Sequence, residues 1–572
     1  MHTFRVWAPL PKTVELSLRG SKVVPMTRVA GGWWTATSAA EPGCVYGFIL
    51  DGSPPLPDPR SQSQPQGIHG LSQLVDHNRF HWTDDGWQAP PLSSAIIYEL
   101  HIGTFTPSGT FLSAIKKLDH LVELGVTHVE LMPVIEFSGN HNWGYDGVDL
   151  FAPHHAYGTP DDLKKLVDAC HARHLAIILD VVYNHLGPTG NYLARYAPYF
   201  TTRYAPTWGA AINYDGAGSD EVRRFFCDNA LMWLRDYHFD GLRLDAVHAI
   251  FDSSAVHFLE QLKYEAERLE MELGRRFVLI PESDLNDPRL LRSREQGGYQ
   301  LDAQWSDDFH HALHSVLTGE RNGYYSDFGG LSDLAGALRH AFVYAGKYSL
   351  HRQRIHGRST EGLSGHRFLG YLQNHDQIGN RAKGERSARL MSLGRLKIGA
   401  ALVLMSPFVP MIFQGEEWGA STPFIFFTDH QEPELAEAVR KGRCQEFAAF
   451  GWKPEEVPDP QARETFEQSK LAWGEISQAP HAEILDWHKK LIQLRQVEPD
   501  LTDGNMEGVR IRFDEQKHWL TLKRGAIRLA CNLSAHAQAV PLIALQGTET
   551  SGQEVHLSPD SVCIYKHDVH LS

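Results

Sequence analysis

The chain has 572 residues, which is too long for one hydrophobic core and indicates several domains. Its 54 basic and 69 acidic residues give a net charge of −15, which argues against a nucleic-acid partner because such proteins favour a basic face. No apolar run approaches the roughly 18 residues of a membrane span, and the six cysteines contain no Cys-x-x-Cys pair. We therefore expect a cytoplasmic protein with reduced cysteines and no membrane partner.

Residues 1–90 contain short segments in which apolar and polar residues alternate. Glycine, proline and serine separate these segments, which lie at 3–9, 13–20, 32–38 and 45–52. A spacing of about ten residues between short strands is typical of a β-sandwich. The N-terminal domain is therefore predicted to be a β-sandwich.

Residues 91–495 alternate strand-like and helix-like patterns. One helix is expected at 112–124, where leucine and isoleucine recur every three or four residues. Eight strand segments are expected, and most of them have the continuous apolar character of parallel strands. They lie at 95–105, 128–134, 176–185, 241–246, 277–284, 301–305, 367–376 and 409–415. This alternation predicts an α/β fold with a (β/α)₈ TIM barrel as the catalytic domain.

Three further segments are assigned from their pattern, length and composition. Residues 496–572 return to strand patterns and predict a small C-terminal all-β domain. Within the barrel region, residues 137–160 are too many for a simple connection, so we expect them to wall a pocket. The basic, Gly- and Ser-rich stretch 345–366 is expected to be an exposed loop.

Four of the predicted strands end in carboxylates and histidines, in DVVYNH (180–185), GLRLDA (241–246), IPESD (280–284) and QNHDQ (373–377). Residues at the carboxyl ends of barrel strands converge on one pocket. Retaining glycoside hydrolysis needs a carboxylate nucleophile and a carboxylic acid about 5–5.5 Å apart. The four segments therefore predict glycoside cleavage.

The residue types indicate individual roles. Arg243 and Asp245 share one face of a strand, so the guanidinium lowers the pKa of Asp245 and makes it the expected nucleophile. Glu282 follows the apolar FVLIP, where a raised pKa suits a general acid/base. Further groups are expected to hold the sugar, namely Asp376, His185 and His375.

These segments resemble the four ordered motifs of the α-amylase superfamily. The resemblance implies Asp245 as nucleophile, Glu282 as general acid/base and Asp376 as transition-state stabiliser. It also implies Arg243, His185 and His375 at the subsite of the cleaved glucose. Tyr145, in NWGYDGV, matches the aromatic platform on which that glucose stacks. The N-terminal domain resembles the carbohydrate-binding-like domain of branching and debranching members.

Longer strings are similar to one branch of that superfamily, the maltooligosyltrehalose trehalohydrolases. They are ELHIGTFTPSGTF, LMPVIEFSGNHNWGYDGV, LDAQWSDDFHHALH, FLGYLQNHDQIGNR and QGEEWGASTPFIFFTDH. The resemblance implies hydrolysis of the α-1,4 bond next to the terminal trehalose of maltooligosyl trehalose, which releases trehalose and a maltooligosaccharide. It also implies a place in trehalose biosynthesis, with maltooligosyltrehalose synthase as the upstream pathway partner.

One departure from the superfamily pattern concerns metal. Many α-amylases bind calcium through the Asn of the first motif and a His four residues after the nucleophile. Here Asn184 is present but Ala249 occupies the second position, so we expect no metal and no cofactor. The neighbouring His248 stands where amylases carry Lys, on the leaving-group side. The pairs 154–155 and 310–311 lack the spacing with Cys or acids that specifies a metal site.

Recognition of trehalose must come from the leaving-group side. A site that hydrogen-bonds the trehalose hydroxyls rejects a sugar that leaves its polar groups unpaired. The string WSDDFHH follows the sixth predicted strand, so Asp307, Asp308 and Phe309 are the candidates for this side.

Two other functions remain open from the sequence. A glycogen branching enzyme shares the domains and the three carboxylates, but it transfers the glycosyl unit to a sugar hydroxyl and releases no trehalose. An inactive carbohydrate-binding protein on the amylase fold is the alternative from another class. Such proteins usually lose members of the carboxylate triad, and all three are present here.

Overall fold

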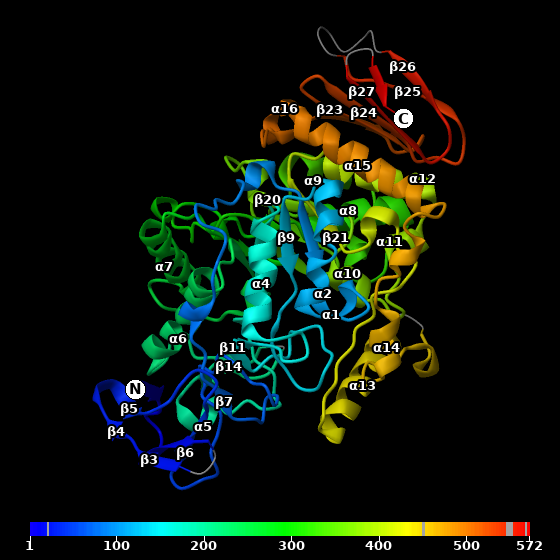
Figure 1. Cartoon of the computed structure of the whole chain (residues 1–572). Helices are drawn as coiled ribbons and strands as arrows, with labels where there is room; N and C mark the ends of the chain where they lie inside the picture. Colours follow the sequence, from blue (N-terminus) through cyan, green and yellow to red (C-terminus); the bar gives the residue numbers. More distant parts are fainter. Residues whose placement is uncertain (20–21, 207, 449–451, 545–552, 567–568, 572) are drawn as a thin grey trace.

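The computed structural model describes residues 1–19, 22–206, 208–448, 452–544, 553–566 and 569–571. Figure 1 shows sheets from the two ends of the chain on opposite sides of a central body of strands and helices. Residue 20, the last position of the strand-like segment expected at 13–20, and residue 567, in the all-β region expected at 496–572, lie outside the described residues.

Two antiparallel sheets form the N-terminal part. One has the order β1-β5-β4 and the other β3-β2-β6-β7. The rings of Phe4 and Tyr46, one from each sheet, lie 4.9 Å apart and join the two inner faces. The strands are β1 (His2–Trp7), β2 (Val14–Leu18), β3 (Lys22–Pro25), β4 (Thr27–Arg28), β5 (Trp33–Ser38), β6 (Val45–Leu50) and β7 (Ser72–Gln73).

The eight predicted barrel strands all form. They are β8 (Ile97–Leu100), β9 (His128–Leu131), β12 (Ala176–Val181), β15 (Gly241–Leu244), β16 (Val278–Pro281), β17 (Gln304–Trp305), β20 (Phe368–Tyr371) and β21 (Val409–Phe413). They pair in parallel in the order β16-β15-β12-β9-β8-β21-β20-β17. The two end strands, β16 and β17, are also joined, because the N–H of Asp302, just before β17, donates to the carbonyl of Leu279 on β16 at 3.0 Å. The sheet is thus a barrel, as the alternating pattern predicted.

Helices surround the barrel (Figure 1). They include α4 (Pro160–His171), α6 (Ser219–Asp236), α7 (Phe258–Leu273), α8 (Asp307–Thr318), α9 (Leu331–His340), α12 (Leu393–Leu404) and α15 (His481–Val497). In α4 the local sequence explains the start, because Thr159 caps the backbone of Asp162 and Pro160 occupies the first turn. The apolar stripe of α4 then packs into the core.

One expected element is wrong in detail. The helix expected at 112–124 is two helices, α2 (Phe111–Ile115) and α3 (Leu118–Leu124). The backbone at Lys117 has ψ near −1°, which ends the helical path, and Leu112 is 44% exposed. The spacing of the apolar residues continues across the break, and lysine gives no signal of it because lysine is a good helix former.

The C-terminal strands form a five-stranded sheet, β22-β23-β24-β27-β28, and a two-stranded sheet, β25-β26. Their bounds are β22 (Arg510–Asp514), β23 (Trp519–Arg524), β24 (Ile527–Asn532), β25 (Gln538–Pro541), β26 (Glu554–Leu557), β27 (Ser561–Lys566) and β28 (Val569–Leu571). The stretch expected to be a loop at 345–366 contains a hairpin of β18 (Lys347–Ser349) and β19 (Arg354–His356). Among the helices of the described residues, none is long and apolar enough to cross a membrane. The six cysteines all lie among the described residues, and none of them forms a disulfide bond.

Candidate active site

A pocket of about 330 Å³ lies at the carboxyl ends of the barrel strands. Its lining combines seven of the residues singled out in the sequence, Tyr145, His185, Asp245, His248, Glu282, His375 and Asp376. They come from loops that follow different strands, which is how a barrel assembles a site. The predicted convergence of the motif residues on one pocket is therefore observed.

Arg243 lies beneath this pocket and is completely buried. It donates through Nη1 to Asp180 Oδ2 at 2.7 Å and to Asp245 Oδ1 at 2.9 Å. Nη2 forms an ion pair of 2.6 Å with Glu282 Oε2. One guanidinium on β15 thus fixes three carboxylates from three adjacent strands or their ends.

Asp245 is held as an anion. Burial alone would raise its pKa, but the charge of Arg243, followed by that of His185 and a hydrogen bond from Asn184, lowers it below the ordinary value. The side-chain N–H of Asn184 donates to the carbonyl and to Oδ2 of Asp245, both at 2.7 Å. Asn184, considered from the sequence only as a calcium ligand, orients the carboxylate expected to be the nucleophile.

Glu282 has the opposite electrostatics. Burial raises its pKa well above the ordinary value, and the carboxylates Asp245, Asp376 and Asp307 add to this against the charge of Arg243. Among the described residues, Arg243 Nη2 forms no hydrogen bond with Glu282, although the two groups lie within ion-pair distance. The pKa values of two carboxyl groups on one guanidinium are therefore shifted in opposite directions, as a nucleophile and a proton donor require.

A chain of hydrogen bonds runs along the floor of the pocket. The Tyr145 hydroxyl donates to Asp180 Oδ2 at 2.6 Å and lies 2.8 Å from His375 Nε2. His185 Nε2 lies 3.0 Å from the backbone carbonyl of Tyr145. The ring of Tyr145 is thereby fixed at the pocket wall.

Asp376 and His248 stand nearer solvent. Asp376 follows His375 at the start of α10 (His375–Gly379), and its side chain is 37% exposed, so it can reach a ligand in the pocket. His248 Nδ1 lies 3.9 Å from Asp284 Oδ1, and Asp284 in turn pairs with Arg352 at 2.8 Å. His248 thus borders the pocket beside the segment that carries Glu282.

Of the residues expected to select trehalose, Asp307 lies near the carboxylates of the site, whereas Asp308 and Phe309 are buried within the fold. Asp307 accepts a hydrogen bond from the Tyr371 hydroxyl at 2.6 Å, and burial together with Asp376 raises its pKa to about 7 despite that bond. Asp308 is buried and accepts from the backbone N–H groups of Val343 and Tyr344 at 2.7 and 2.8 Å.

Phe309 is completely buried and packs on Phe408 at 5.3 Å. The three residues 307–309 are not in the lining of the 330 Å³ pocket. Of the three, Asp307 is the residue whose charge raises the pKa of Glu282.

The structure adds wall residues that sequence reasoning missed. Trp143, Phe426 and Arg443 line the same pocket, with the Arg443 guanidinium 4.7 Å from the Phe426 ring and the Trp143 ring 5.2 Å from it. Trp143 lies inside the quoted NWGYDGV string, so a signal for it existed. Arg443 comes from α13 (Pro433–Ala448), whose polar sequence contains nothing to mark it.

Comparisons with known proteins now decide the family. A family model described as the α-amylase catalytic domain matches residues 67–205. A malto-oligosyltrehalose trehalohydrolase from Mycobacterium tuberculosis is 50% identical over 548 residues, which covers 95% of this chain and 94% of that protein. One from Saccharolobus solfataricus is 44% identical, over 91% of this chain and 89% of its own. The chain belongs to the malto-oligosyltrehalose trehalohydrolase family.

This membership confirms the expected family and makes the chain a glycoside hydrolase of the α-amylase type. A solved structure from Salmonella typhimurium, provisionally described as an α-amylase, has a TM-score of 0.90 and 39% identity and covers 98% of this chain and 97% of its own. A branching enzyme from Vibrio cholerae is 37% identical over 238 residues, which is 37% of this chain and 32% of that enzyme. The branching enzyme is therefore a partial relative, whereas the trehalohydrolases match nearly end to end.

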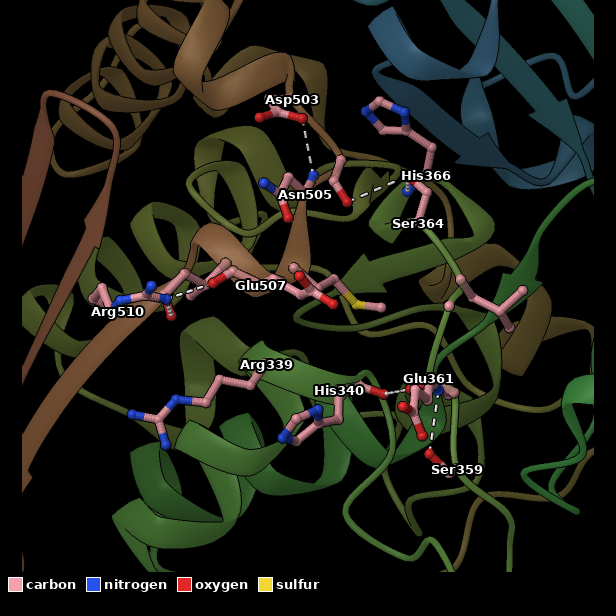
Figure 2. Close-up of a pocket in the computed structure, with 16 residues that line it drawn as sticks. Arg339, His340, Ser359, Glu361, Ser364, His366, Asp503, Asn505, Glu507 and Arg510 are labelled. Atoms are coloured by element: carbon pink, nitrogen blue, oxygen red, sulfur yellow. Dashed lines mark hydrogen bonds between the residues drawn. The ribbon is translucent and has the colours of Figure 1, made fainter.

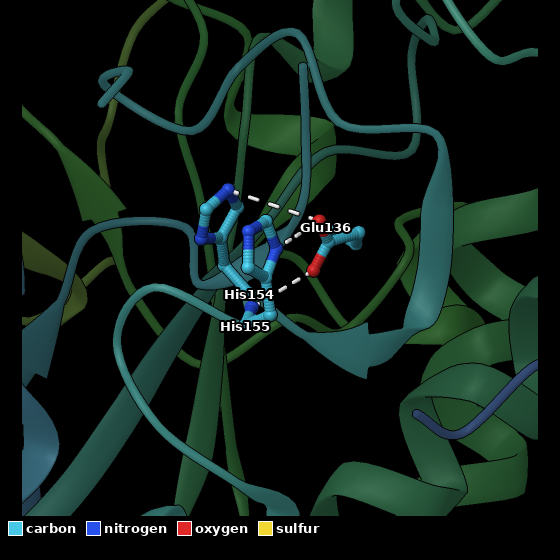
Figure 3. Close-up of side chains that lie close together, drawn as sticks. All are labelled: Glu136, His154 and His155. Atoms are coloured by element: carbon cyan, nitrogen blue, oxygen red, sulfur yellow. Dashed lines mark hydrogen bonds and ion pairs between the residues drawn. The ribbon is translucent and has the colours of Figure 1, made fainter. Parts of the chain in front are cut away.

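A cluster of possible metal ligands lies outside the pocket (Figure 3). Glu136 on β10 (Ile135–Glu136) pairs with His155 Nδ1 at 2.7 Å and accepts from the His155 backbone N–H at 2.9 Å. His154 Nδ1 accepts the N–H of Ala156 at 3.0 Å, which leaves the ring proton on Nε2, 3.9 Å from Glu136 Oε1. A metal needs a lone pair at that nitrogen. The tautomer inferred from this contact therefore suits an ion pair between Glu136 and His155 better than a metal site.

A second cavity, of about 1010 Å³, lies between α9 and the segment that precedes β22 (Arg510–Asp514) (Figure 2). Arg339, Glu361, His366 and Glu507 are among its lining residues, which include no Trp, Tyr or Phe. Sugar sites in proteins usually include aromatic side chains, and Tyr145 is one of those that line the other pocket. Although it is smaller, the pocket with the carboxylates is the candidate active site for this family member.

Proposed function

We propose that this chain hydrolyses the α-1,4-glucosidic bond adjacent to the terminal trehalose of maltooligosyl trehalose, releasing trehalose and a maltooligosaccharide. One observation supports this most directly. Asp245 and Glu282 contact the same buried Arg243, yet the pKa of one is lowered and that of the other raised. That pairing matches a retaining glycosidase, and the family relationship names the trehalose-ended substrate.

In the proposed first step, Asp245 attacks the anomeric carbon of the glucose in the pocket. Glu282 donates its proton to the bridging oxygen, so the trehalose leaves as a neutral alcohol and a covalent glycosyl ester remains on Asp245. In the second step Glu282 accepts a proton from water, whose oxygen attacks the same carbon and frees Asp245. Each carboxyl returns to its starting protonation state.

The neighbouring groups have supporting roles in this proposal. Tyr145 stacks on the reacting glucose, His185 and His375 donate hydrogen bonds to it, and Arg243 keeps Asp245 ionised. Asp376 binds sugar hydroxyls more strongly in the distorted transition state than in the substrate.

On the leaving-group side, His248 and Asp307 are the stronger candidates for contact with trehalose. His248 lines the pocket, and Asp307 influences Glu282 electrostatically. Asp308 would act indirectly, through the 343–344 backbone and the Asn286 side chain that it binds. Phe309 would act only through packing of the strand beneath it.

The proposal also includes a pathway. Maltooligosyltrehalose synthase would supply the trehalose-ended substrate, and trehalose would be the product. We propose the cytoplasm as the location, supported by six cysteines that form no disulfide bond among the described residues.

The decisive experiment uses two substrates. The protein is incubated with maltotriosyl trehalose and, separately, with maltopentaose, and the products are resolved by chromatography. We expect fast release of trehalose and maltotriose from the first substrate and slow cleavage of the second. Comparable cleavage of both substrates would reduce the proposal to a general α-amylase-type hydrolase. Transfer to a branched glucan with no free trehalose would replace it with the branching-enzyme function.

A further inference from the structure

A carboxylate from the barrel interior lies directly under the pocket histidine. Glu99 is on β8, and its Oε1 atom lies 2.5 Å from His375 Nδ1. Its Oε2 atom accepts the backbone N–H of His375 at 3.2 Å. Both side chains are 1% exposed, so water does not compete for these contacts. Glu99 therefore binds both the ring and the backbone of His375, which follows β20, the second strand from β8 in the order of the barrel.

The other side of the His375 ring faces a second acceptor. The Tyr145 hydroxyl gives its proton to Asp180 Oδ2 at 2.6 Å, so its oxygen is left to accept from His375 Nε2 at 2.8 Å. Asp180 is itself held by Arg243. With an acceptor at each nitrogen, the ring is suited to carry both protons.

We propose that Glu99 is a positioning residue, which holds His375 as a doubly protonated donor and through it fixes Tyr145 at the wall of the active site. Glu99 does not line the pocket and touches no substrate. The inference rests on the proposed function only for the substrate used in its test, because the geometry concerns the protein alone.

The charges around His375 agree with this geometry. Burial by itself lowers the pKa of His375, but the charges of Glu99 and Asp376 and the hydrogen bond to Glu99 raise it to about 9. Other titratable or charged groups face it from the surrounding elements, and they are Arg243, Glu130, Asp245, His101 and Tyr145. Without the Glu99 charge, burial and Arg243 would favour the neutral ring.

The adjacent strand supplies a matched control. Glu130 on β9 is in register with Glu99 and is as deeply buried. Its two carboxylate oxygens have no hydrogen-bond partner among the described residues. Burial, followed by the charges of Glu99 and Asp180, raises its pKa well above the ordinary value and so favours its uncharged form. A glutamine at 130 therefore copies the native group, whereas a glutamine at 99 removes a charge.

The test compares the pH dependence of trehalose release from maltotriosyl trehalose by the wild type, Glu99→Gln and Glu130→Gln. We expect the alkaline midpoint of kcat/KM to move at least one pH unit lower in Glu99→Gln, with activity recovering on acidification. Glu130→Gln should keep the wild-type midpoint. A uniform loss at every pH with an unchanged midpoint in Glu99→Gln, or no loss at all, would overturn the proposal. If the wild type prefers maltopentaose, the substrate proposal fails, and the same comparison made with maltopentaose still decides the role of Glu99.

A second measurement needs no variant at position 99. Histidine labelled with carbon-13 at Cε1 is titrated by NMR in the wild type, and the His375 resonance is the one missing from His375→Gln. A ring that remains protonated up to pH 8 supports the inference. A midpoint below pH 7 contradicts it, even if Glu99→Gln does not fold.

Discussion

Phe309 allows a sharp test of which residues near the site select trehalose and which support the barrel. Phe309→Ala removes a completely buried ring that packs on Phe408, and the ring edge lies 3.0 Å from the point that a Cβ on Gly370 of β20 would occupy. Truncation of a buried Phe lowers the free energy of unfolding by about 3–5 kcal/mol. An unfolding entropy of about 2.1 cal/mol/K per residue gives about 0.8 kcal/mol/K for a unit of roughly 400 residues, so Tm should fall by about 4–6 °C.

The assay combines thermal unfolding with the ratio of kcat/KM on maltotriosyl trehalose to that on maltopentaose. For Phe309→Ala we expect the lower Tm with an unchanged ratio at a temperature well below the transition. Phe426→Ala is the matched control, because that ring is part-exposed and lines the pocket. It should change the kinetics with a smaller change in Tm. An unchanged Tm with a lost trehalose preference in Phe309→Ala would refute the assignment of Phe309 to the core.

Three further predictions follow from the charges and contacts. Glu282→Gln should lower kcat by about 10²–10⁴ with KM little changed, because it removes the general acid and keeps the shape; a kcat within tenfold of the wild type would reassign the acid. Asp308→Ala removes the acceptor of the backbone N–H groups of Val343 and Tyr344 and of the Asn286 side-chain amide, and each buried donor left unpaired costs about 1–3 kcal/mol. Calorimetry should therefore show a lower Tm, while chromatography shows an unchanged preference for the trehalose-ended substrate. His375 has a pKa of about 9 in the folded protein against 6.5 ordinarily. Its protonation therefore adds about 3 kcal/mol to the free energy of unfolding below pH 6.5, and this stabilisation is lost as the pH rises through 9. The wild-type Tm should fall over that range more than the Tm of Glu99→Gln does.

The sequence was most informative where local pattern and strand topology agree. Asp245, Glu282 and Asp376 could be placed together because each follows a buried strand, and parallel barrel strands deliver their carboxyl ends to one face. The opposite pKa shifts of Asp245 and Glu282 were predicted from Arg243 and from the apolar FVLIP, and the structure shows those directions. The single helix at 112–124 was wrong, because an apolar period does not reveal a backbone break at two lysines.

Contacts between segments distant in the sequence could not be read in the same way. The sequence offered Asn184 as a calcium ligand, and only the packing of two strand ends shows that it binds Asp245. The cluster at 305–311 looked uniform, but the first turn of α8 sends Asp307 toward the site and Phe309 into the core. A helix alternates its faces within a few residues, so a short polar and aromatic string does not show which side chain reaches a pocket.

The chain by itself therefore determined the barrel, the carboxylates at its strand ends and the kind of chemistry they support. These features depend on periodic burial and on residues that follow strands, and both are local properties of the sequence. The tertiary structure alone decided which residues from distant segments support the site. Glu99 reaches His375 across the barrel, and Arg443 reaches Phe426 from a separate helix, because their distances are set by closure of the whole sheet and the packing around it. Electrostatic interactions depend on separation in space and on burial, which no spacing along the chain records.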